Sequence, residues 1–484
     1  MDLQAFDDMG PRVTQFANLL IFLTTILAFH FLWGELLRLY HRINRQDNLL
    51  QTAGFSDREF WILGYVLFLF FHLNSLPDAT PDTLLSTLVY LASGLILKIR
   101  RQGPNSLSYC LLGLVLGLGF LTKAILLPLA VVFLATAALS AVPRRRGKVY
   151  SLLGALVFAG IAGAYGFGLS RAKGQFSLGE AGYLNYAWHV NRASFLHWQG
   201  ELPGLGKPEH PTRKIYSSPP IYEFASPISA TFPPWYDPAY WNQGLRIRFR
   251  PSDQFAASWK ALREYVSELR SQVILIVGVS VLLLVRPDRR TLLRESLDIW
   301  YVWIPALAAF LLYGLIWVED RYVAQFFVLF WAAALILVRL PVTKDCRRLI
   351  RTVTVVVATL LSLKIAYDFR QNISVEHSDA KFQMQMARGL VAKGIGSGEN
   401  IAVLDAGMGV EWQKLLRVHI VAEIPSGHEA EFWAADTAKR AQIYEILGKT
   451  GPRFLVASQI PDWASTTGWD RIDGTPAYVF YLNK

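Results

Sequence analysis

Long apolar stretches separated by short polar loops dominate the first three quarters of the chain. Ten of them have the character of membrane-spanning helices, although several fall slightly short of the roughly 20 residues that a straight span needs. They cover residues 13–34, 60–76, 83–98, 107–121, 124–142, 149–169, 271–285, 298–317, 322–338 and 350–367. The pattern predicts a mainly α-helical polytopic membrane protein with about ten transmembrane helices.

Two regions break this pattern and suggest the domain organisation. Residues 1–170 form a first membrane half with about six spans, and residues 271–369 form a second half with about four. Between them, residues 171–270 are polar, aromatic and proline-rich, which disfavours long helices and central strands. We expect a structured external loop there and, in residues 370–484, a small external α/β domain.

The predicted α/β domain alternates strands and helices. We expect strands at Asn400–Leu404, His419–Ile424, Phe454–Ser458 and Ala477–Leu482, and helices at Asp379–Lys393 and Glu429–Leu447. The segment Val403–Gly409 contains a GxG motif after an acidic residue, which is how some nucleotide-binding loops begin. We interpret it as a turn, because the domain lies outside and is short for a complete cofactor fold.

Composition supports the membrane class and excludes others. Of 484 residues, 53% are hydrophobic and only 18% charged, which is atypical of a soluble enzyme with one core. The net charge of +11 reports loop orientation in a membrane protein before it suggests nucleic acid, and we expect no nucleic-acid partner. Two cysteines are too few for a disulfide framework or a cysteine metal site, and no other ligand cluster indicates a metal.

Basic residues are concentrated in alternate loops, which predicts the orientation. One set of loops carries twenty of them and the alternate set carries three, Arg12, Lys123 and Arg321. Since basic loops stay in the cytoplasm, the N-terminus, the long loop and the C-terminal domain are predicted to be external.

The long loop combines aromatic rings with hydrogen-bonding side chains. Flat aromatic faces beside histidine, glutamine and asparagine suit a sugar, whose C–H faces stack while its hydroxyls need partners. His197, Trp198 and Gln199 are the strongest candidates. The alternative is that the aromatic residues form the core of the loop itself or lie at headgroup level.

Three short external turns hold charges that the orientation rule does not explain. One carries Asp78 and Asp82, a tight hairpin carries Lys123, and a third contains Glu319, Arg321 and Tyr322. Charged groups at the membrane edge are costly and tend to be paired or functional, although long side chains also anchor helix ends there. We expect the three turns to converge on one external site.

The same turns carry a resemblance to a family. Pro-Asp-Thr-Leu-Leu at Pro81–Leu85, Gly-Leu-Gly-Phe-Leu-Thr-Lys at Gly117–Lys123 and Glu-Asp-Arg-Tyr at Glu319–Tyr322 resemble segments of the GT-C class of polytopic glycosyltransferases. The similarity is greatest to the branch of protein mannosyltransferases and lipid A aminoarabinose transferases. It covers residues 11 to about 339, and Gly117–Lys123 is its most specific part.

The resemblance implies transfer of a sugar from a polyprenyl-phosphate donor to an envelope lipid, glycan or protein at the external face of a bacterial cytoplasmic membrane. It implies that Lys123 binds the donor phosphate, with Asp82 and Arg321 lining the same pocket, and that no further cofactor is needed. In the family, a carboxylate in the first external loop is the base. This chain departs from the family by starting outside, so we expect a preceding segment or a lost catalytic loop, and Asp7 and Asp8 are the carboxylates in the right compartment.

Two functions therefore stay open at the level of sequence. The first is a membrane glycosyltransferase, and the second is a non-catalytic protein of similar fold that binds or assembles an envelope glycan system. A transporter fits less well, because the spans lack paired proline breaks and mid-membrane ionisable residues. The sequence does not identify the sugar, the acceptor or the oligomeric state.

Overall fold

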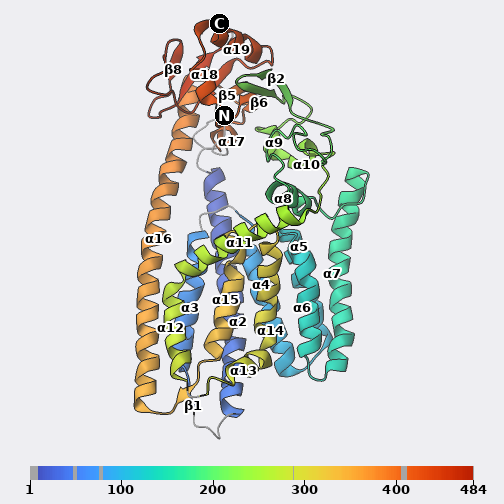
Figure 1. The fold of residues 1–484 in the computed structure, drawn as a ribbon, viewed down its shortest axis with the longest axis vertical. Coiled ribbons are helices and arrows are strands. Elements are labelled where there is room, and N and C mark those ends of the chain that lie inside the picture. The colour runs from blue at the N-terminus through green and yellow to red at the C-terminus, as the bar shows by residue number, and fades with distance from the viewer. Residues whose placement is uncertain (1–8, 47–51, 76–79, 287, 405–410, 483–484) are drawn as a thin grey trace. The chain divides into compact units, whose positions relative to one another are not determined.

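The computed structural model describes residues 9–46, 52–75, 80–286, 288–404 and 411–482 (Figure 1). The chain divides into two compact units, each made of two segments. Unit 1 comprises Met1–Val190 and Phe249–Asn372, and unit 2 comprises Asn191–Arg248 and Ile373–Lys484.

Unit 1 is helical, apart from a small strand pair. Its helices are α2 (Met9–Gln46), α3 (Asp57–His72), η2 (Leu73–Ser75), α4 (Asp82–Gln102), α5 (Ser106–Thr122), α6 (Leu126–Ser140), α7 (Arg144–Lys173), α8 (Ala181–His189), α11 (Pro251–Ser271), α12 (Val273–Val285), α13 (Leu292–Asp298), α14 (Trp300–Gly314), α15 (Asp320–Ile336) and most of α16 (Lys344–Ala392). Strands β1 (Thr52–Ala53) and β4 (Leu340–Pro341) pair antiparallel. Local signals explain several boundaries: Ser56 and Glu59 form a capping box at α3, and Asn105 caps α5.

Each of the ten apolar stretches predicted from the sequence overlaps a helix, namely α2 to α7, α12, α14, α15 and α16, although several predicted ends lie a few residues beyond the helix. Among the described residues, four of these helices (α2, α4, α7 and α16) are long and apolar enough to cross a membrane. The number rises to at most six if each of the bent pairs α11–α12 and α13–α14 counts as one span. The others, such as α6 with 15 residues, are shorter. The chain is thus a multi-pass membrane protein, and the crossing of all ten stretches stays a prediction.

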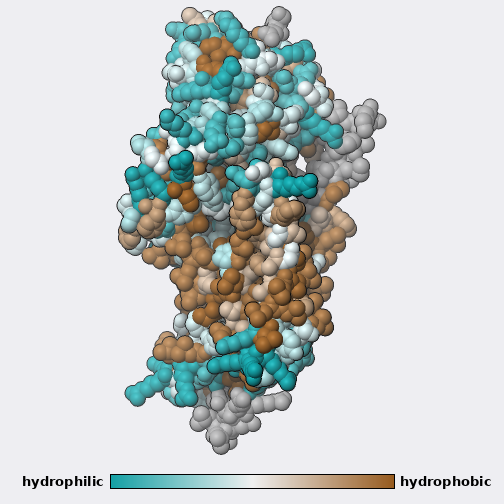
Figure 2. Space-filling model, turned by 90° about the vertical axis from the view of Figure 1, so that its right-hand side faces the viewer, coloured by the Kyte–Doolittle hydropathy of each residue, from teal (hydrophilic) through white to brown (hydrophobic). Residues whose placement is uncertain are grey.

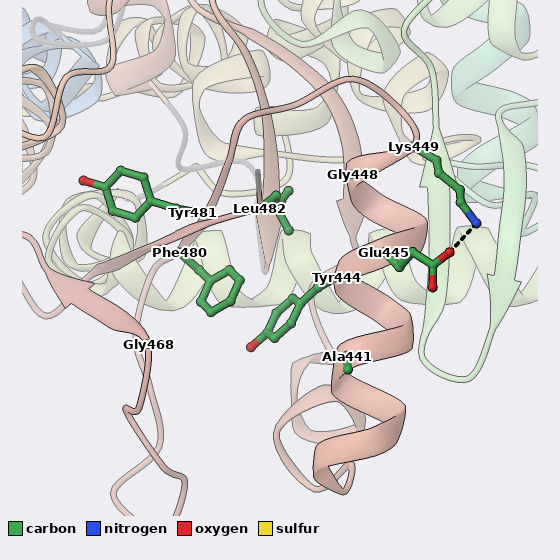
Figure 3. Close-up of a pocket in the computed structure, with 9 residues that line it drawn as sticks. All are labelled: Ala441, Tyr444, Glu445, Gly448, Lys449, Gly468, Phe480, Tyr481 and Leu482. Carbon is green, nitrogen blue, oxygen red and sulfur yellow. Dashed lines mark ion pairs between the residues drawn. The ribbon is translucent and has the colours of Figure 1, made fainter. Parts of the chain in front are cut away.

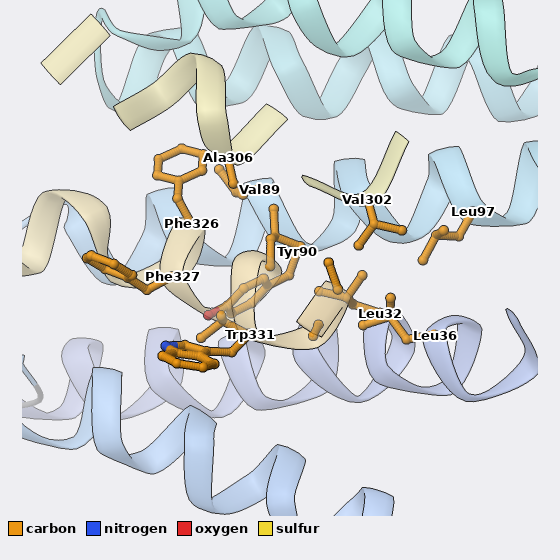
Figure 4. Packing of buried hydrophobic residues seen from close by; sticks show 14 of the residues in the cluster. Leu32, Leu36, Val89, Tyr90, Leu97, Val302, Ala306, Phe326, Phe327 and Trp331 are labelled. Carbon is orange, nitrogen blue, oxygen red and sulfur yellow. The ribbon is translucent and has the colours of Figure 1, made fainter. Parts of the chain in front are cut away.

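Helix α4 lies at the centre of unit 1. Its most apolar part is 83% buried, compared with 17% for α7. Figure 4 shows Val89 and Tyr90 of α4 among side chains of α2, α14 and α15. Close packing of α5 against α7 depends on two glycines, because a Cβ on Gly113 would lie 2.1 Å from the carbonyl oxygen of Gly154.

The outer faces of the unit 1 helices are apolar. Figure 2 shows a broad hydrophobic band that is bordered by hydrophilic side chains at its lower end. Exposed residues of this kind include Leu152, Leu156 and Phe167 of α7, with exposures of 67, 69 and 70%. A predominantly apolar outer surface is expected where lipid, not water, is the solvent.

Unit 2 is built on a seven-stranded sheet in the order β2-β3-β6-β5-β7-β9-β8. Its strands are β2 (Arg213–Ser217), β3 (Pro220–Glu223), β5 (Asn400–Leu404), β6 (His419–Ile424), β7 (Phe454–Ala457), β8 (Trp469–Arg471) and β9 (Tyr478–Tyr481), and its helices are α9 (Pro233–Tyr236), α10 (Pro238–Trp241), α17 (Glu411–Leu416), α18 (Glu429–Trp433), α19 (Thr437–Gly448) and the end of α16. Strand β5 is parallel to β6 and β7, and the remaining pairs are antiparallel.

Alternating side chains of the central strands fill two cores. Ile401 and Val403 of β5 pack with Met386 and Leu390 of α16 on one face. Ala402 and Leu404 of the same strand pack on the other face, in a cluster with Phe432, Ile443 and Leu447 of α18 and α19. Successive side chains of the strand therefore point to opposite faces of the sheet, and helices cover both faces.

The sequence separates the long loop from the C-terminal region, whereas the structure joins them in one sheet. Strand β3, from the loop, pairs with β6 from the C-terminal region, with Tyr222 opposite Glu423. Strands β5 and β6 coincide with two predicted strands. The helix expected at 429–447 is divided into α18 and α19, because Asp436 caps a new helix through its side chain. The GxG motif lies outside the described residues.

Candidate functional site at three helix ends

Three helix ends of unit 1 place charged residues together. Asp82 is the first residue of α4, Lys123 directly follows α5, and Glu319 directly precedes α15. Carboxylates are favourable at helix N-termini and a cation is favourable at a C-terminus, because each complements the helix dipole. The local sequence thus stabilises each helix end with the charge that it presents.

The side chains of these turns form a chain of ion pairs. Lys123 Nζ lies 2.5 Å from Asp82 Oδ1, and Arg321 Nε lies 3.7 Å from Asp82 Oδ2 and 2.8 Å from Glu319 Oε2. The Asp82 side chain is 4% exposed, whereas Lys123 and Arg321 keep exposures of 22 and 32%. The three charged turns meet, as the sequence predicts, with a buried carboxylate behind two accessible cations.

Tyr322 provides an aromatic wall beside both cations. Lys123 Nζ lies 3.3 Å and Arg321 Cζ lies 5.3 Å from the centroid of its ring. The ring of Tyr313 stacks on that of Tyr322 with centroids 5.6 Å apart. A cation over an aromatic face is stabilised by the ring quadrupole, so Tyr322 holds the two positive charges in position.

A buried polar contact fixes α4 against α15 below the ion pairs. Ser86 Oγ lies 3.1 Å from Gln325 Oε1 and 3.0 Å from the carbonyl oxygen of Asp82, and Gln325 Nε2 donates to the carbonyl of Tyr322. Ser86 and Gln325 are 1 and 0% exposed. Because buried polar groups are costly unless paired, this contact favours one register of the two helices and hence one geometry of the site.

The pKa of two groups in the cluster is shifted by burial and by their partners. Burial lowers the pKa of Lys123, while the Asp82 carboxylate opposes this shift. Burial raises the pKa of Glu319, but hydrogen bonds from Trp317 and Arg321 outweigh it and leave that pKa below its usual value. Glu319 is therefore ionised at neutral pH. Asp82 contacts both cations, so its position suits holding them in place.

Three further residues surround the loop before α15, and the sequence did not single them out as site residues. Trp317 Nε1 donates to Glu319 Oε1 at 2.9 Å, His189 stacks on Trp317 with centroids 4.3 Å apart, and Lys260 Nζ lies 4.2 Å from the centroid of Trp317. Burial, and then Lys260, lower the pKa of His189. The position of Trp317 two residues before a charged turn is the only sequence signal for this cluster.

The three loop candidates belong to unit 2 and are engaged within it. His197 is 7% exposed, contacts Glu423, lies 2.9 Å from Thr212 Oγ1 and stacks on Tyr222 at 4.1 Å. Trp198 is 1% exposed. In this structure its ring presents no open face for a sugar. This burial favours the alternative from the sequence, in which the aromatic residues form the core of the loop itself.

Gln199 is held in the same way. Its Nε2 donates to the carbonyl of Thr212 at 2.8 Å, and its backbone N–H donates to Glu201. Three predicted site residues, Asp7, Asp8 and Asp78, lie outside the described residues, so their roles stay predictions. In the described ranges, no three His, Cys, Asp or Glu side chains are grouped to hold a metal ion.

Two hollows, one in each unit, are described by the residues that line them. One, of about 570 Å³ in unit 1, lies between α11, α12, α14 and α15 and is lined almost wholly by apolar side chains, including Phe310 and Phe327. The other, of about 700 Å³, is in unit 2 (Figure 3), where Tyr444 stacks on Phe480 and Lys449 pairs with Glu445. No residue predicted from the sequence to be functional lines the second hollow.

The fold was compared with known proteins. No protein-family model matches the sequence, and no curated protein matches it. Among solved structures, ArnT from Cupriavidus metallidurans is similar, both bound to undecaprenyl phosphate (TM-score 0.49, 12% identity, 96% of this chain and 84% of that chain) and in the apo state (0.46, 14%, 96% and 83%). An Archaeoglobus fulgidus oligosaccharyltransferase, in complex with zinc and sulfate, also matches (0.45, 13%, 92% and 56%).

Proposed function

We propose that this chain is a membrane glycosyltransferase that takes a sugar from a polyprenyl-phosphate donor and transfers it to an envelope lipid, glycan or protein. The observation that carries the proposal is the geometry at Lys123 and Arg321. Two cations reach the end of an apolar helix bundle, and the buried Asp82 carboxylate holds both. This is the arrangement that a lipid phosphate requires, with charge at the membrane edge and apolar surface beside it.

The apolar hollow of unit 1 that Phe310 and Phe327 line, an open groove, suits the lipid part of such a donor. Phe310 lies about one turn before Tyr313 on α14, and Phe327 lies about 1.4 turns beyond Tyr322 on α15. The helices that carry the aromatic wall of the site therefore also carry the wall of the groove. A polyprenyl chain contributes binding free energy through each buried methylene, which an apolar groove of about 570 Å³ provides.

The reaction follows from the charges. When an acceptor hydroxyl attacks the anomeric carbon, the bond from that carbon to the phosphate oxygen breaks and negative charge collects on the leaving phosphate. Lys123 and Arg321 stabilise that charge, and an interaction that strengthens as the bond breaks raises the turnover rate as well as the affinity. A carboxylate is needed to accept the acceptor proton, and Asp7 and Asp8 remain the candidates from the sequence.

The test is a transfer assay with the full chain in nanodiscs. A radiolabelled polyprenyl-phosphate sugar and a bacterial envelope fraction are supplied, and label in the acceptor and free polyprenyl phosphate are measured. Wild type should release polyprenyl phosphate in step with transfer, and Lys123→Ala should lower the rate. Lys364→Ala is the matched control, since Lys364 is also a partly exposed lysine, 2.8 Å from an aspartate carboxylate on α16.

Lys123→Arg separates the contribution of charge from that of shape. A planar guanidinium should restore only part of the rate at a site shaped for an ammonium. Donor binding without any transfer in wild type would favour the second function, a non-catalytic binding partner. An unchanged rate in a well-folded Lys123→Ala protein would remove this residue from the site.

A further inference from the structure

Helix α11 carries a continuous exposed apolar stripe. Its members are Phe255, Trp259, Leu262, Val266 and Leu269, with exposures of 70, 48, 48, 40 and 37%. Their spacings of four, three, four and three residues place them on one face of the helix. Because a row of large apolar side chains is unfavourable in water, an apolar phase or partner covers this face.

The side of α11 that faces the protein is different. Ala257 and Ala261 are buried, Gln254 Nε2 donates to the carbonyl of Leu315 at 2.7 Å, and Tyr265 OH donates to the carbonyl of Phe310 at 2.7 Å. The apolar stripe is therefore not the face by which α11 docks on unit 1.

A third face of α11 is polar and exposed. It includes Ser252, Arg263, Ser267 and Arg270. One helix thus has a face packed on protein, an apolar exposed face and a polar exposed face. That division is typical of a helix that lies in the plane of a membrane surface, with lipid on one side and water on the other.

The charges and the bend at its end argue against α11 as part of a span. It contains six charged residues in 21, namely Asp253, Lys260, Arg263, Glu264, Glu268 and Arg270. A crossing orientation would place several of them in hydrocarbon, which is costly for charged side chains. Helix α12, which is apolar throughout, departs from α11 at an angle of 72°.

The exposed apolar surface continues from α11 into α12. Val273, Val277, Val281 and Leu284 are 52, 56, 37 and 57% exposed along the next helix. Whatever covers the stripe of α11 must therefore also lie next to the exposed apolar side chains of α12, which suit contact with lipid. This continuity favours the bilayer over a separate protein as the occupant.

We propose that α11 is an interfacial helix whose stripe inserts at the boundary between lipid headgroups and acyl chains. Trp259 suits that depth, because an indole combines an apolar ring with one hydrogen-bond donor. The three acidic and three basic residues of α11 balance, so apolar area drives the contact and anionic lipid is not required. Since Lys260 lies over Trp317, the helix also sets the depth of the loop before α15.

The experiment measures depth in the intact chain. Cys110 and Cys346 are replaced by alanine, and single cysteines are introduced by Phe255→Cys, Leu262→Cys and Val266→Cys in the stripe. Ser252→Cys and Ser267→Cys are the matched controls on the polar face. Each protein is labelled with a nitroxide in phosphatidylcholine nanodiscs, and collision with oxygen is compared with collision with a water-soluble nickel chelate.

We expect a several-fold higher ratio of oxygen to nickel collisions at the three stripe positions than at the two controls, and the same ratio when part of the lipid is anionic. Equal nickel access at all five positions would overturn the proposal, because the stripe would lie in water. Stripe labels shielded from both reagents, with spin coupling that disappears on dilution with unlabelled protein, would assign the face to a second copy instead. A ratio that rises only with anionic lipid would contradict the role of apolar area.

Discussion

Two clusters of paired ionisable side chains, one in each unit, differ in how much of the pair reaches solvent. In unit 1, Lys123 and Arg321 keep 22 and 32% of their side chains exposed over the buried Asp82. In unit 2, His197 and Glu423 contact each other at exposures of 6 and 3%. One cluster has partly exposed cations, while both members of the other are buried.

The difference is the one we expect between the proposed phosphate site and a contact that stabilises the fold. His197 and Glu423 come from segments 226 residues apart, and Thr212 and Tyr222 complete their surroundings. Their contact therefore helps to attach the loop segment to the C-terminal part of the sheet. Mutations in the unit 2 cluster should accordingly affect stability, whereas mutations of the unit 1 cations should also affect ligand affinity.

The largest effect on stability is expected from His197→Ala. Removing one member of a buried pair leaves the Glu423 carboxylate without its partner, which costs about 3–5 kcal/mol. Hydrogen exchange of the β3 and β6 amides in the full chain measures the effect. The control is His428→Ala, which breaks a His–Glu pair with exposures of 44 and 45% and should have a much smaller effect, because exposed pairs contribute little. Equal effects of the two variants would contradict the structural role of His197.

Arg321→Ala should lower affinity for a polyprenyl phosphate about tenfold, with little loss of stability. A hydrogen bond to a charged group contributes about 1.5–3 kcal/mol, and part of this is retained by Lys123. Isothermal titration with undecaprenyl phosphate, the lipid in the Cupriavidus structure, measures the effect in nanodiscs. Arg290→Ala, an exposed arginine in another loop, is the control and should bind as wild type does. An affinity unchanged by Arg321→Ala would exclude this cation from the phosphate site.

Trp317→Phe should have a smaller effect on binding, of about threefold or less. The phenyl ring keeps a surface for His189 and Lys260 but loses the hydrogen bond to Glu319, and a neutral donor contributes about 0.5–1.5 kcal/mol. The same titration checks it. A loss as large as that of Arg321→Ala would mean that Trp317 contacts the ligand itself.

The smallest expected effect is a pH dependence of stability at His189. Burial and Lys260 lower its pKa from 6.5 in the folded state, so the unfolded state binds more protons below pH 6.5. Stability is therefore retained above pH 6.5 and declines as the pH falls towards the lower folded pKa. Wild type should lose more thermal stability than His189→Gln between pH 7.5 and 5.5, by under about 1.4 kcal/mol per pH unit. Parallel profiles would show that His189 is not shielded.

Much of unit 1 could be predicted from the sequence, because apolar runs and charged turns are local signals. The meeting of Asp82, Lys123 and Arg321 followed from three charged turns assigned to one side of the membrane. The number of crossings is a different matter: α5 and α6 have 17 and 15 residues, so their length alone does not show that they span.

Unit 2 was less predictable, because its sheet depends on contacts distant in sequence. No local pattern shows that β3 pairs with β6 across 200 residues of chain. The aromatic residues around Trp198 have the composition of a sugar site. Whether an aromatic ring can stack on a sugar depends on its exposure, which is set by tertiary contacts and not by local sequence. For the same reason the sequence did not identify Trp317 and His189 as neighbours of the site, because their stacking is a tertiary contact.

The most direct test of the claim that Lys123 binds the donor phosphate is the affinity for undecaprenyl phosphate. It is measured for wild type, for Lys123→Ala and for the double variant Asp82→Asn/Lys123→Met. Lys123→Ala should lower affinity about 10- to 100-fold and also lower stability, because Asp82 loses its nearest partner. The double variant carries no orphaned charge, so its stability should recover while its affinity stays low. Affinity that recovers together with stability would contradict the account, since Lys123 would then support the fold without binding the phosphate.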